Sequence, residues 1–108
     1  MDFRVMSDKA ILEELGARLR RQRLNQDITQ KELAEKAAVS RTVIQKMEQG
    51  EEVVVAGLIR VMRALSLLDQ LDNFLPDPGI SPIQLARLQG KERQRASGDR
   101  KSANNGES

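Results

Sequence analysis

The chain of 108 residues contains no cysteine, histidine, tryptophan or tyrosine. Without cysteine it has no disulfide framework and no thiolate metal site. Without histidine it lacks the commonest metal ligand and the commonest general base. It also lacks a glycine-rich phosphate loop, since the upstream glycine and the following Ser or Thr are missing around its lone Gly-Lys pair. We therefore predict that the protein is not an enzyme and binds no metal or cofactor.

Aromatic residues and long apolar runs are also scarce. Phe3 and Phe74 are the only aromatic residues, so the core must be aliphatic, and RNA binding by base stacking on aromatic side chains is disfavoured. No apolar run approaches the roughly 20 residues that span a bilayer. The first residues, MDFRVMSD, have neither the basic nor the apolar region of a signal peptide. We expect a soluble, cytoplasmic protein with no membrane partner.

Charge is distributed unevenly along the chain, although the net charge is only +2. Residues 9–49 carry nine basic against six acidic residues, a net +3. Residues 50–90 carry three against five, a net −2, and residues 91–108 carry five against three, a net +2. An asymmetry of this kind is compatible with a basic binding face in the first half and a second basic segment in the tail.

Apolar residues at helical spacing predict an all-α fold with five helices in the first 75 residues. Their expected positions are about 8–25, about 29–37, 40–49, a face made by Leu58, Ile59, Met62 and Leu65, and a short segment made by Leu67, Leu68, Leu71, Phe74 and Leu75. Capping residues support these limits. Thr29 and Glu32 form a capping box, Ser40 can cap the third helix, and Gly50 can end it.

The run PDPG at 76–79 predicts the end of the globular part. Ser81 and Pro82 can begin a further, looser helix, which Gly90 is expected to interrupt. The polar composition of the last dozen residues predicts disorder. The expected organisation is an N-terminal arm at 1–8, a folded helical domain at 9–76, a linker and partly helical extension at 77–96, and a disordered tail at 97–108.

The second and third predicted helices have the spacing of a helix-turn-helix, whose second helix enters the major groove of DNA. The open face of that helix carries hydrogen-bonding side chains of moderate reach. Arg41 can pair with guanine, Gln45 with adenine, and Thr42 with a thymine methyl group. The predicted base contacts are Ser40, Arg41, Thr42 and Gln45. The predicted phosphate contacts are Thr29, Gln30, Lys46 and Arg21.

The segment LRRQRLNQDITQKELAEKAAVSRTVIQKMEQG resembles the Xre/Cro-type helix-turn-helix family, the group of the lambdoid phage repressors. The resemblance covers roughly residues 12–75. The residues that carry it are Arg23, Thr29, Gln30, Glu32, Leu33, Ala34, Val39, Ser40, Ile44, Glu48 and Gly50. It implies a compact five-helix, lambda-repressor-like domain that binds a near-palindromic operator as a dimer and controls transcription. It also implies that Arg23 pairs with Glu48 and that Gln30 meets a backbone phosphate.

Two positions depart from the family pattern. Ala38 stands where the family usually has Gly, at a turn position that favours a positive φ, which costs a residue with a Cβ about 1 kcal/mol. Glu51 and Glu52 stand where the family often has Lys or Arg. These two carboxylates repel phosphate, so we expect weaker binding on that side, or compensation by another basic segment.

These observations are compatible with several functional interpretations. The leading one is a homodimeric repressor that binds double-stranded DNA, with a dimer surface made by Leu67, Leu68, Leu71 and Phe74. The alternative is an antitoxin that binds a protein toxin and represses its own operon. Small Xre-type proteins with an appended segment resemble antitoxins, including partners of HipA-like kinase toxins. The basic tail can also attract phosphate, and Arg18, Arg20 and Arg21 can equally form an ordinary solvated face.

Overall fold

The structure, a computed structural model, describes residues 1–97. These residues form helices and loops without any strand, which confirms the predicted all-α class. The helical elements are η1 (Phe3–Val5), α1 (Asp8–Asn25), α2 (Gln30–Ala37), α3 (Arg41–Glu48), α4 (Val55–Ala64), η2 (Leu68–Gln70), α5 (Leu71–Phe74) and α6 (Pro82–Ser97). Along this part of the chain, no helix is both long and apolar enough to cross a membrane. Most of the tail predicted at 97–108 lies outside the described residues.

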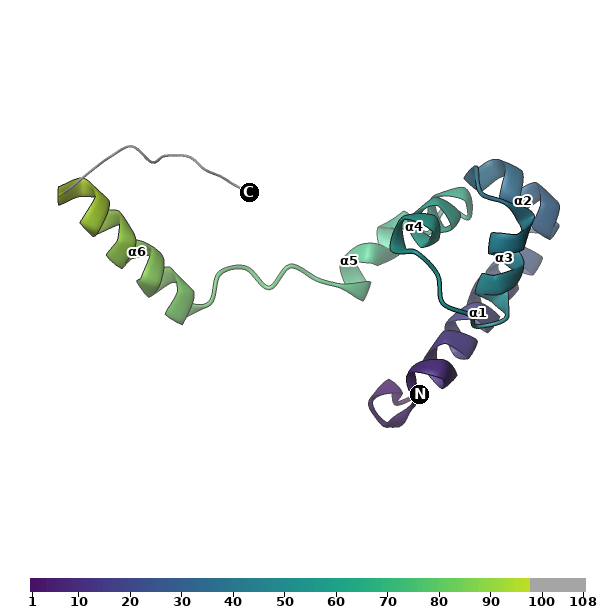
Figure 1. Ribbon diagram of the computed structural model, residues 1–108, viewed down its shortest axis with the longest axis horizontal. Helices are drawn as coiled ribbons and strands as arrows, with labels where there is room; N and C mark the ends of the chain where they lie inside the picture. The colour runs from purple at the N-terminus through teal and green to yellow at the C-terminus, as the bar shows by residue number, and fades with distance from the viewer. Residues whose placement is uncertain (98–108) are drawn as a thin grey trace. The chain divides into compact units, whose positions relative to one another are not determined.

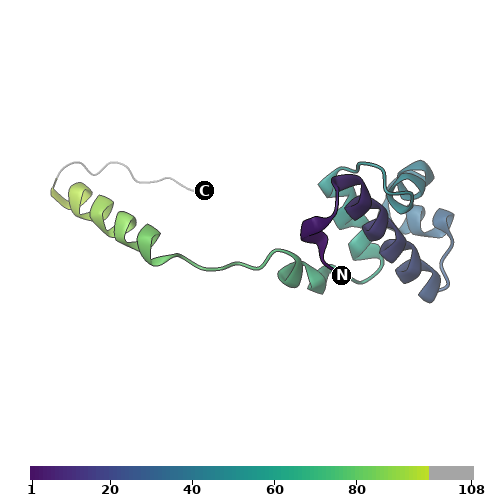
Figure 2. The same cartoon turned by 90° about the horizontal axis from the view of Figure 1, so that it is seen from below.

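The chain divides into two compact units, Met1–Leu75 and Pro76–Ser108. In the first unit α3 packs against α1 and α2, and α4 packs against α2 (Figure 1). The 3₁₀ turn η1 and helix α2 lie at opposite ends of α1 (Figure 2). The first residues therefore form a helical turn near one end of α1. There the guanidinium of Arg18 lies 5.1 Å from the centre of the Phe3 ring.

Side-chain caps explain where α1 and α2 begin. Ser7 caps α1 by accepting a hydrogen bond from the Ala10 amide, at 3.1 Å. Thr29 and Glu32 form both bonds of a capping box, at 3.0 and 2.8 Å. After α3, Gly50 has φ of +82°, a left-handed conformation that glycine adopts without steric cost. These local signals determine where α2 begins and where α3 ends.

The core is small and aliphatic, as the composition requires. Its buried members are Leu33, Ala34, Ala37, Ile44, Met47, Val61, Ala64 and Leu65. The predicted face of α4 is confirmed only in part: Leu65 is buried and Leu58 packs partly buried against the core, but the buried Val61 and Ala64 were not predicted. The reason is that α4 is apolar around most of its circumference, so residue spacing alone does not identify one inward face.

Helices α1 and α3 approach each other closely at Gly16. A Cβ atom on Gly16 would collide with the carbonyl oxygen of Met47 and would lie 2.9 Å from that of Glu48. Gly50 lies in a similarly tight place, because a Cβ there would come within 2.6 Å of the Glu13 Cα. Backbone contact of this kind brings the end of α3 directly against the middle of α1.

The second unit contains helix α6. Ser81 caps it by accepting a hydrogen bond from the Gln84 amide at 3.1 Å, and Pro82 occupies the first helical position. The helix continues through Gly90, so the predicted interruption is wrong. A glycine in a helix costs only about 1 kcal/mol relative to alanine. Along this helix the apolar side chains of Ile83, Leu85 and Leu88 are exposed within the unit.

Candidate nucleic-acid interface

Helices α2 and α3 form a helix-turn-helix whose turn is residues 38–40. Ala38 has φ of 57° and ψ of 42°, the left-handed conformation that the sequence led us to expect at this position. The turn is closed by the Val39 amide, which donates to the Ala34 carbonyl at 3.0 Å. Ser40 then begins α3, and its hydroxyl oxygen accepts from the Val43 amide at 3.1 Å. The backbone thus fixes the direction in which α3 leaves the turn.

Helix α3 has a buried side and an exposed side. Ile44 and Met47 are buried in the core, whereas Arg41, Thr42 and Lys46 are exposed. Thr42 and Lys46 are four residues apart and share one face of the helix. Three of the side chains predicted to contact DNA are therefore open to an incoming ligand, and the other α3 candidate, Gln45, is half-buried.

Two predicted contact residues, Ser40 and Thr29, also serve as helix caps. Each hydroxyl oxygen accepts a backbone N–H, Ser40 from Val43 and Thr29 from Glu32. A hydroxyl group retains its own hydrogen for donation. Both residues can therefore stabilise their helices and still donate to an acceptor oxygen on a ligand.

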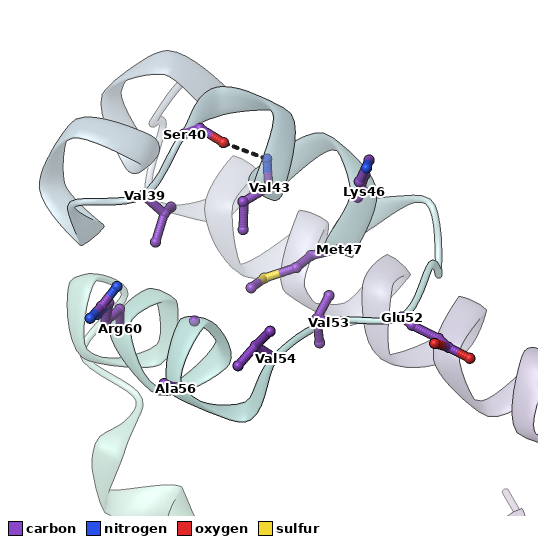
Figure 3. Close-up of a pocket in the computed structure, with 11 residues that line it drawn as sticks. Val39, Ser40, Val43, Lys46, Met47, Glu52, Val53, Val54, Ala56 and Arg60 are labelled. Carbon is purple, nitrogen blue, oxygen red and sulfur yellow. Dashed lines mark hydrogen bonds between the residues drawn. The ribbon is translucent and has the colours of Figure 1, made fainter.

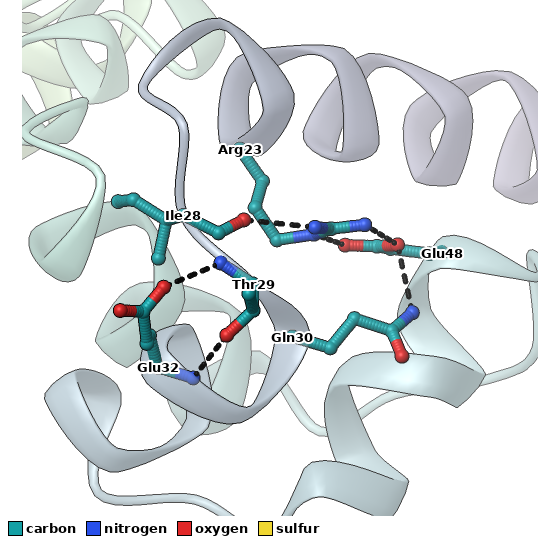
Figure 4. Close-up of polar contacts among 6 residues, drawn as sticks. All are labelled: Arg23, Ile28, Thr29, Gln30, Glu32 and Glu48. Atoms are coloured by element: carbon teal, nitrogen blue, oxygen red, sulfur yellow. Dashed lines mark hydrogen bonds and ion pairs between the residues drawn. The ribbon is translucent and has the colours of Figure 1, made fainter.

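A buried ion pair joins the end of α1 to the end of α3 (Figure 4). Arg23 donates from Nε and Nη2 to the two carboxylate oxygens of Glu48, at 2.7 and 3.0 Å. Its Nη1 donates to the Ile28 carbonyl at 2.8 Å. The two side chains are only 8% and 5% exposed. The hydrogen bond to Glu48 raises the pKa of Arg23 above its ordinary value, so the arginine is held in its charged form.

Gln30 joins this pair from the first turn of α2. Its amide nitrogen donates to the Glu48 carboxylate at 3.1 Å (Figure 4). From the sequence we predicted only a phosphate contact for Gln30, and nothing in the sequence indicated its hydrogen bond to Glu48. A glutamine amide has two N–H donors, so the second remains for a ligand. Glu48 thus accepts from both α1 and α2, and the three helices that build the interface meet at one carboxylate.

A groove of about 400 Å³ runs between α3 and α4. Val43 and Met47 of α3 face Val54, which lies in the loop between α3 and α4, across this groove (Figure 3). Arg60 of α4 lines the groove together with Lys46. The sequence analysis did not single out Arg60, because its place beside α3 depends on how α4 packs. Glu52, from the acidic loop after α3, also lines the groove.

The remaining predicted site residues lie outside α2 and α3. Arg21 is exposed on α1, with Nη2 3.6 Å from a carboxylate oxygen of Glu14. Arg18 also binds Glu14, at 2.9 Å. The predicted dimer residues are clustered in sequence in η2, α5 and the residue before them. Among these, Leu67, Leu68 and Leu71 are partly buried, and Phe74 is 68% exposed.

A family model described as "Helix-turn-helix domain" matches residues 14–74. The match spans more than half of the chain, and the chain belongs to this family. The protein is thus a DNA-binding regulator of the helix-turn-helix class, which confirms the recognition made from the motif around residues 29–50.

Among solved structures, the chain is similar to one from a "SINR protein/SINI protein complex". The two are 23% identical, with a TM-score of 0.45, over 78% of this chain and 99% of that chain. None of the curated proteins matches the chain.

Proposed function

We propose that the protein is a sequence-specific repressor that acts as a homodimer in the cytoplasm and reads the major groove with residues 40–49. The observation that carries this proposal is the division of α3 between two tasks. Ile44 and Met47 anchor the helix in the core, while Arg41, Thr42 and Lys46 are exposed. A helix of this kind fits a major groove about 12 Å wide. The role is binding rather than catalysis.

The proposed contacts follow from the chemistry of each side chain. Arg41 pairs with guanine, and Thr42 contacts a thymine methyl group. Gln45, being half-buried, contacts adenine only at the edge of the helix face, and the Ser40 hydroxyl donates to a nearby base acceptor. Phosphate oxygens are bound by Thr29, Gln30, Lys46 and Arg21, which position the domain without reading sequence.

Binding to DNA just upstream of the gene, compared with a scrambled duplex by fluorescence anisotropy, tests the proposal. We expect preference for the upstream DNA and a loss of about 1–3 kcal/mol of that preference in Arg41→Ala, the range of a bidentate base contact. Lys36→Ala is a matched control, because Lys36 is an exposed cation near the end of α2 rather than on α3. Unchanged preference in Arg41→Ala would contradict the assigned readout.

The dimer is proposed to form through η2 and α5. Phe74 and Leu75 are 68% and 79% exposed, and a symmetric dimer matches a palindromic operator. We expect the protein to sediment as a dimer and Phe74→Ser with Leu75→Ser to sediment as a monomer. Val5→Ser, at an 83% exposed valine of η1, should leave the dimer intact. A monomeric parent protein would refute this surface.

A second candidate function is neutralisation of a protein toxin, combined with repression of its operon. The observation that favours it is the exposure of Ile83, Leu85 and Leu88 on α6, at 69%, 46% and 39%. Co-purification with the product of the adjacent gene tests it. The complex should be lost in Leu85→Ser with Leu88→Ser, while DNA binding by the first unit persists. Failure of the full-length protein to bind that product rules this candidate out.

A further inference from the structure

The folded unit that carries the helix-turn-helix has no net charge. Met1–Leu75 contains twelve basic and twelve acidic residues. DNA is a polyanion, and proteins gain most of their sequence-independent affinity by neutralising phosphates with Lys and Arg. A neutral unit gains little from long-range attraction, although individual side chains on α3 can still meet phosphate. A basic segment elsewhere in the chain would therefore add electrostatic attraction to the local contacts made by this unit.

Helix α6 is the most basic element that follows. Its residues Pro82–Ser97 include four basic residues and one acidic residue, a net charge of +3. Arg87 and Lys91 are both exposed, and neither takes part in an ion pair with a side chain of residues 1–91. They are four residues apart, so they share one face about 6 Å apart along the axis. The sequence continues this spacing with a third basic residue at position 95.

We propose that α6 is a second DNA-binding element, which binds backbone phosphates through Arg87 and Lys91 without reading base sequence. This inference rests on the proposed function, since DNA is the ligand in both, but it assigns the electrostatic part of affinity to a different unit of the chain. Exposed cations in regular spacing on a helix suit a regular row of phosphates. Leu85 lies on nearly the opposite side of α6 from Arg87, whereas Leu88 is three residues before Lys91 and borders the basic face.

The peptide connection between α5 and α6 strengthens a phosphate contact made by α6. Residues 75–81 connect α5 to α6 and can extend over at most about 25 Å. Once α3 is bound, α6 is held close to the same duplex, and a short tether of this kind gives an effective concentration in the millimolar range. A weak phosphate-binding helix therefore adds to the affinity of the whole chain. It also offsets the repulsion of phosphate by Glu51 and Glu52, which are exposed after α3.

The test is the salt dependence of binding by the full chain to a scrambled duplex, measured for the parent and for Arg87→Gln with Lys91→Gln. Two phosphate contacts contribute about 1.8 to the slope of log K against log salt concentration. Between 50 and 200 mM salt, we expect parent affinity to fall about tenfold more than that of the double variant. Glutamine preserves helix formation, and circular dichroism checks that α6 remains helical.

A matched variant, Lys9→Gln with Arg63→Gln, removes the same charge from exposed positions on α1 and α4 and should keep the parent slope. Equal slopes for the parent and the α6 variant overturn the proposal, as does an equal decrease in both variants, since that reports net charge alone. Binding of the parent to anionic lipid vesicles with no effect of Arg87 and Lys91 on DNA also overturns it, because α6 would then serve a membrane surface.

These outcomes are separable from those of the proposed function. Sequence preference is measured as the ratio of affinities for the upstream and scrambled duplexes, and the α6 variant should leave this ratio unchanged. If the parent shows no preference, the proposed repressor function fails while the slope comparison still tests α6. If preference is present and the slopes are equal, the proposal for α6 fails alone.

Discussion

The guanidinium of Arg23 and the carboxylate of Glu48 face each other through two hydrogen bonds, although 25 residues separate them in the chain. Both side chains are nearly inaccessible to solvent. Water cannot replace either partner, so the two charges depend on each other and on the Ile28 carbonyl and the Gln30 amide. The pair thereby fixes the end of α3 relative to α1.

Removing one partner of this pair should be strongly destabilising. We expect Arg23→Met to lower the free energy of unfolding by about 3–5 kcal/mol, because the Glu48 carboxylate would remain buried without its cation. Urea denaturation followed by circular dichroism measures this loss. Glu14→Gln, which breaks the more exposed pair with Arg18, should cost less than about 1 kcal/mol. Similar losses for the two variants would contradict the structural role given to Arg23.

Gly16 should not tolerate a side chain. A methyl group there collides with the α3 backbone, and overpacking of this kind costs about 1–3 kcal/mol, which exceeds the gain in helix propensity. We expect Gly16→Ala to lower the melting temperature. Gly90→Ala is the matched control, since a Cβ at Gly90 meets no atom within 4 Å. A Gly16→Ala variant as stable as the parent would show that α1 and α3 can separate without loss.

Ala38 is expected to be an unfavourable residue at its position. In the left-handed conformation an L-residue is strained by about 1–2 kcal/mol, whereas glycine adopts it freely but loses more entropy on folding. We therefore expect Ala38→Gly to stabilise the protein by about 0.5–1 kcal/mol in urea denaturation. Ala56→Gly, in the first turn of α4, should have the opposite sign. Destabilisation by Ala38→Gly would mean that strain at this turn is negligible.

Glu32 should make stability depend on acidic pH. The pKa of Glu32 is lowered below its usual 4.5, mainly by a hydrogen bond from the Thr29 backbone amide and secondly by a hydrogen bond with the Thr29 side chain. A lowered pKa in the folded state means that the carboxylate stabilises the fold above pH 4.5, and that this contribution is lost as the pH falls through the folded-state pKa.

Glu32→Gln provides the comparison, because glutamine accepts the same capping hydrogen bond but does not titrate. We expect this variant to lose less stability than the parent when urea denaturation is repeated at pH 7 and at pH 3. An NMR titration of the Glu32 side chain measures the shift directly. A midpoint at or above 4.5, or equal acid losses in the two proteins, would be inconsistent with an ionised capping box.

Local signals predicted the central motif well. Thr29 with Glu32, Ser40 and Gly50 determine helix ends through contacts within a few residues, so their chemistry can be read from short stretches of sequence. The positive φ at Ala38 was also expected, from the family pattern. By contrast, nothing local identified Asp27 and Ser66, which have φ of 56° and 61°.

Features that depend on packing between distant segments were not predicted. The contact of Gln30 with Glu48, the place of Arg60 beside the groove and the collision at Gly16 all require knowledge of how two helices cross. The buried face of α4 was predicted only in part for the same reason: Leu65 was assigned correctly, but Val61 and Ala64 were missed. Gly90 was overinterpreted as a break, because an exposed helix tolerates a single glycine.

The three exposed polar residues of α3 affect how this protein can evolve. Arg41, Thr42 and Lys46 make no hydrogen bond or ion pair with other described side chains, whereas the neighbouring Glu48 holds three helices together. If α3 reads base sequence as proposed, mutations of these three residues alter which DNA is bound while the scaffold still folds. Duplicated copies of such a gene can diverge to control separate sets of genes by replacing a few surface residues, while each copy keeps the same fold.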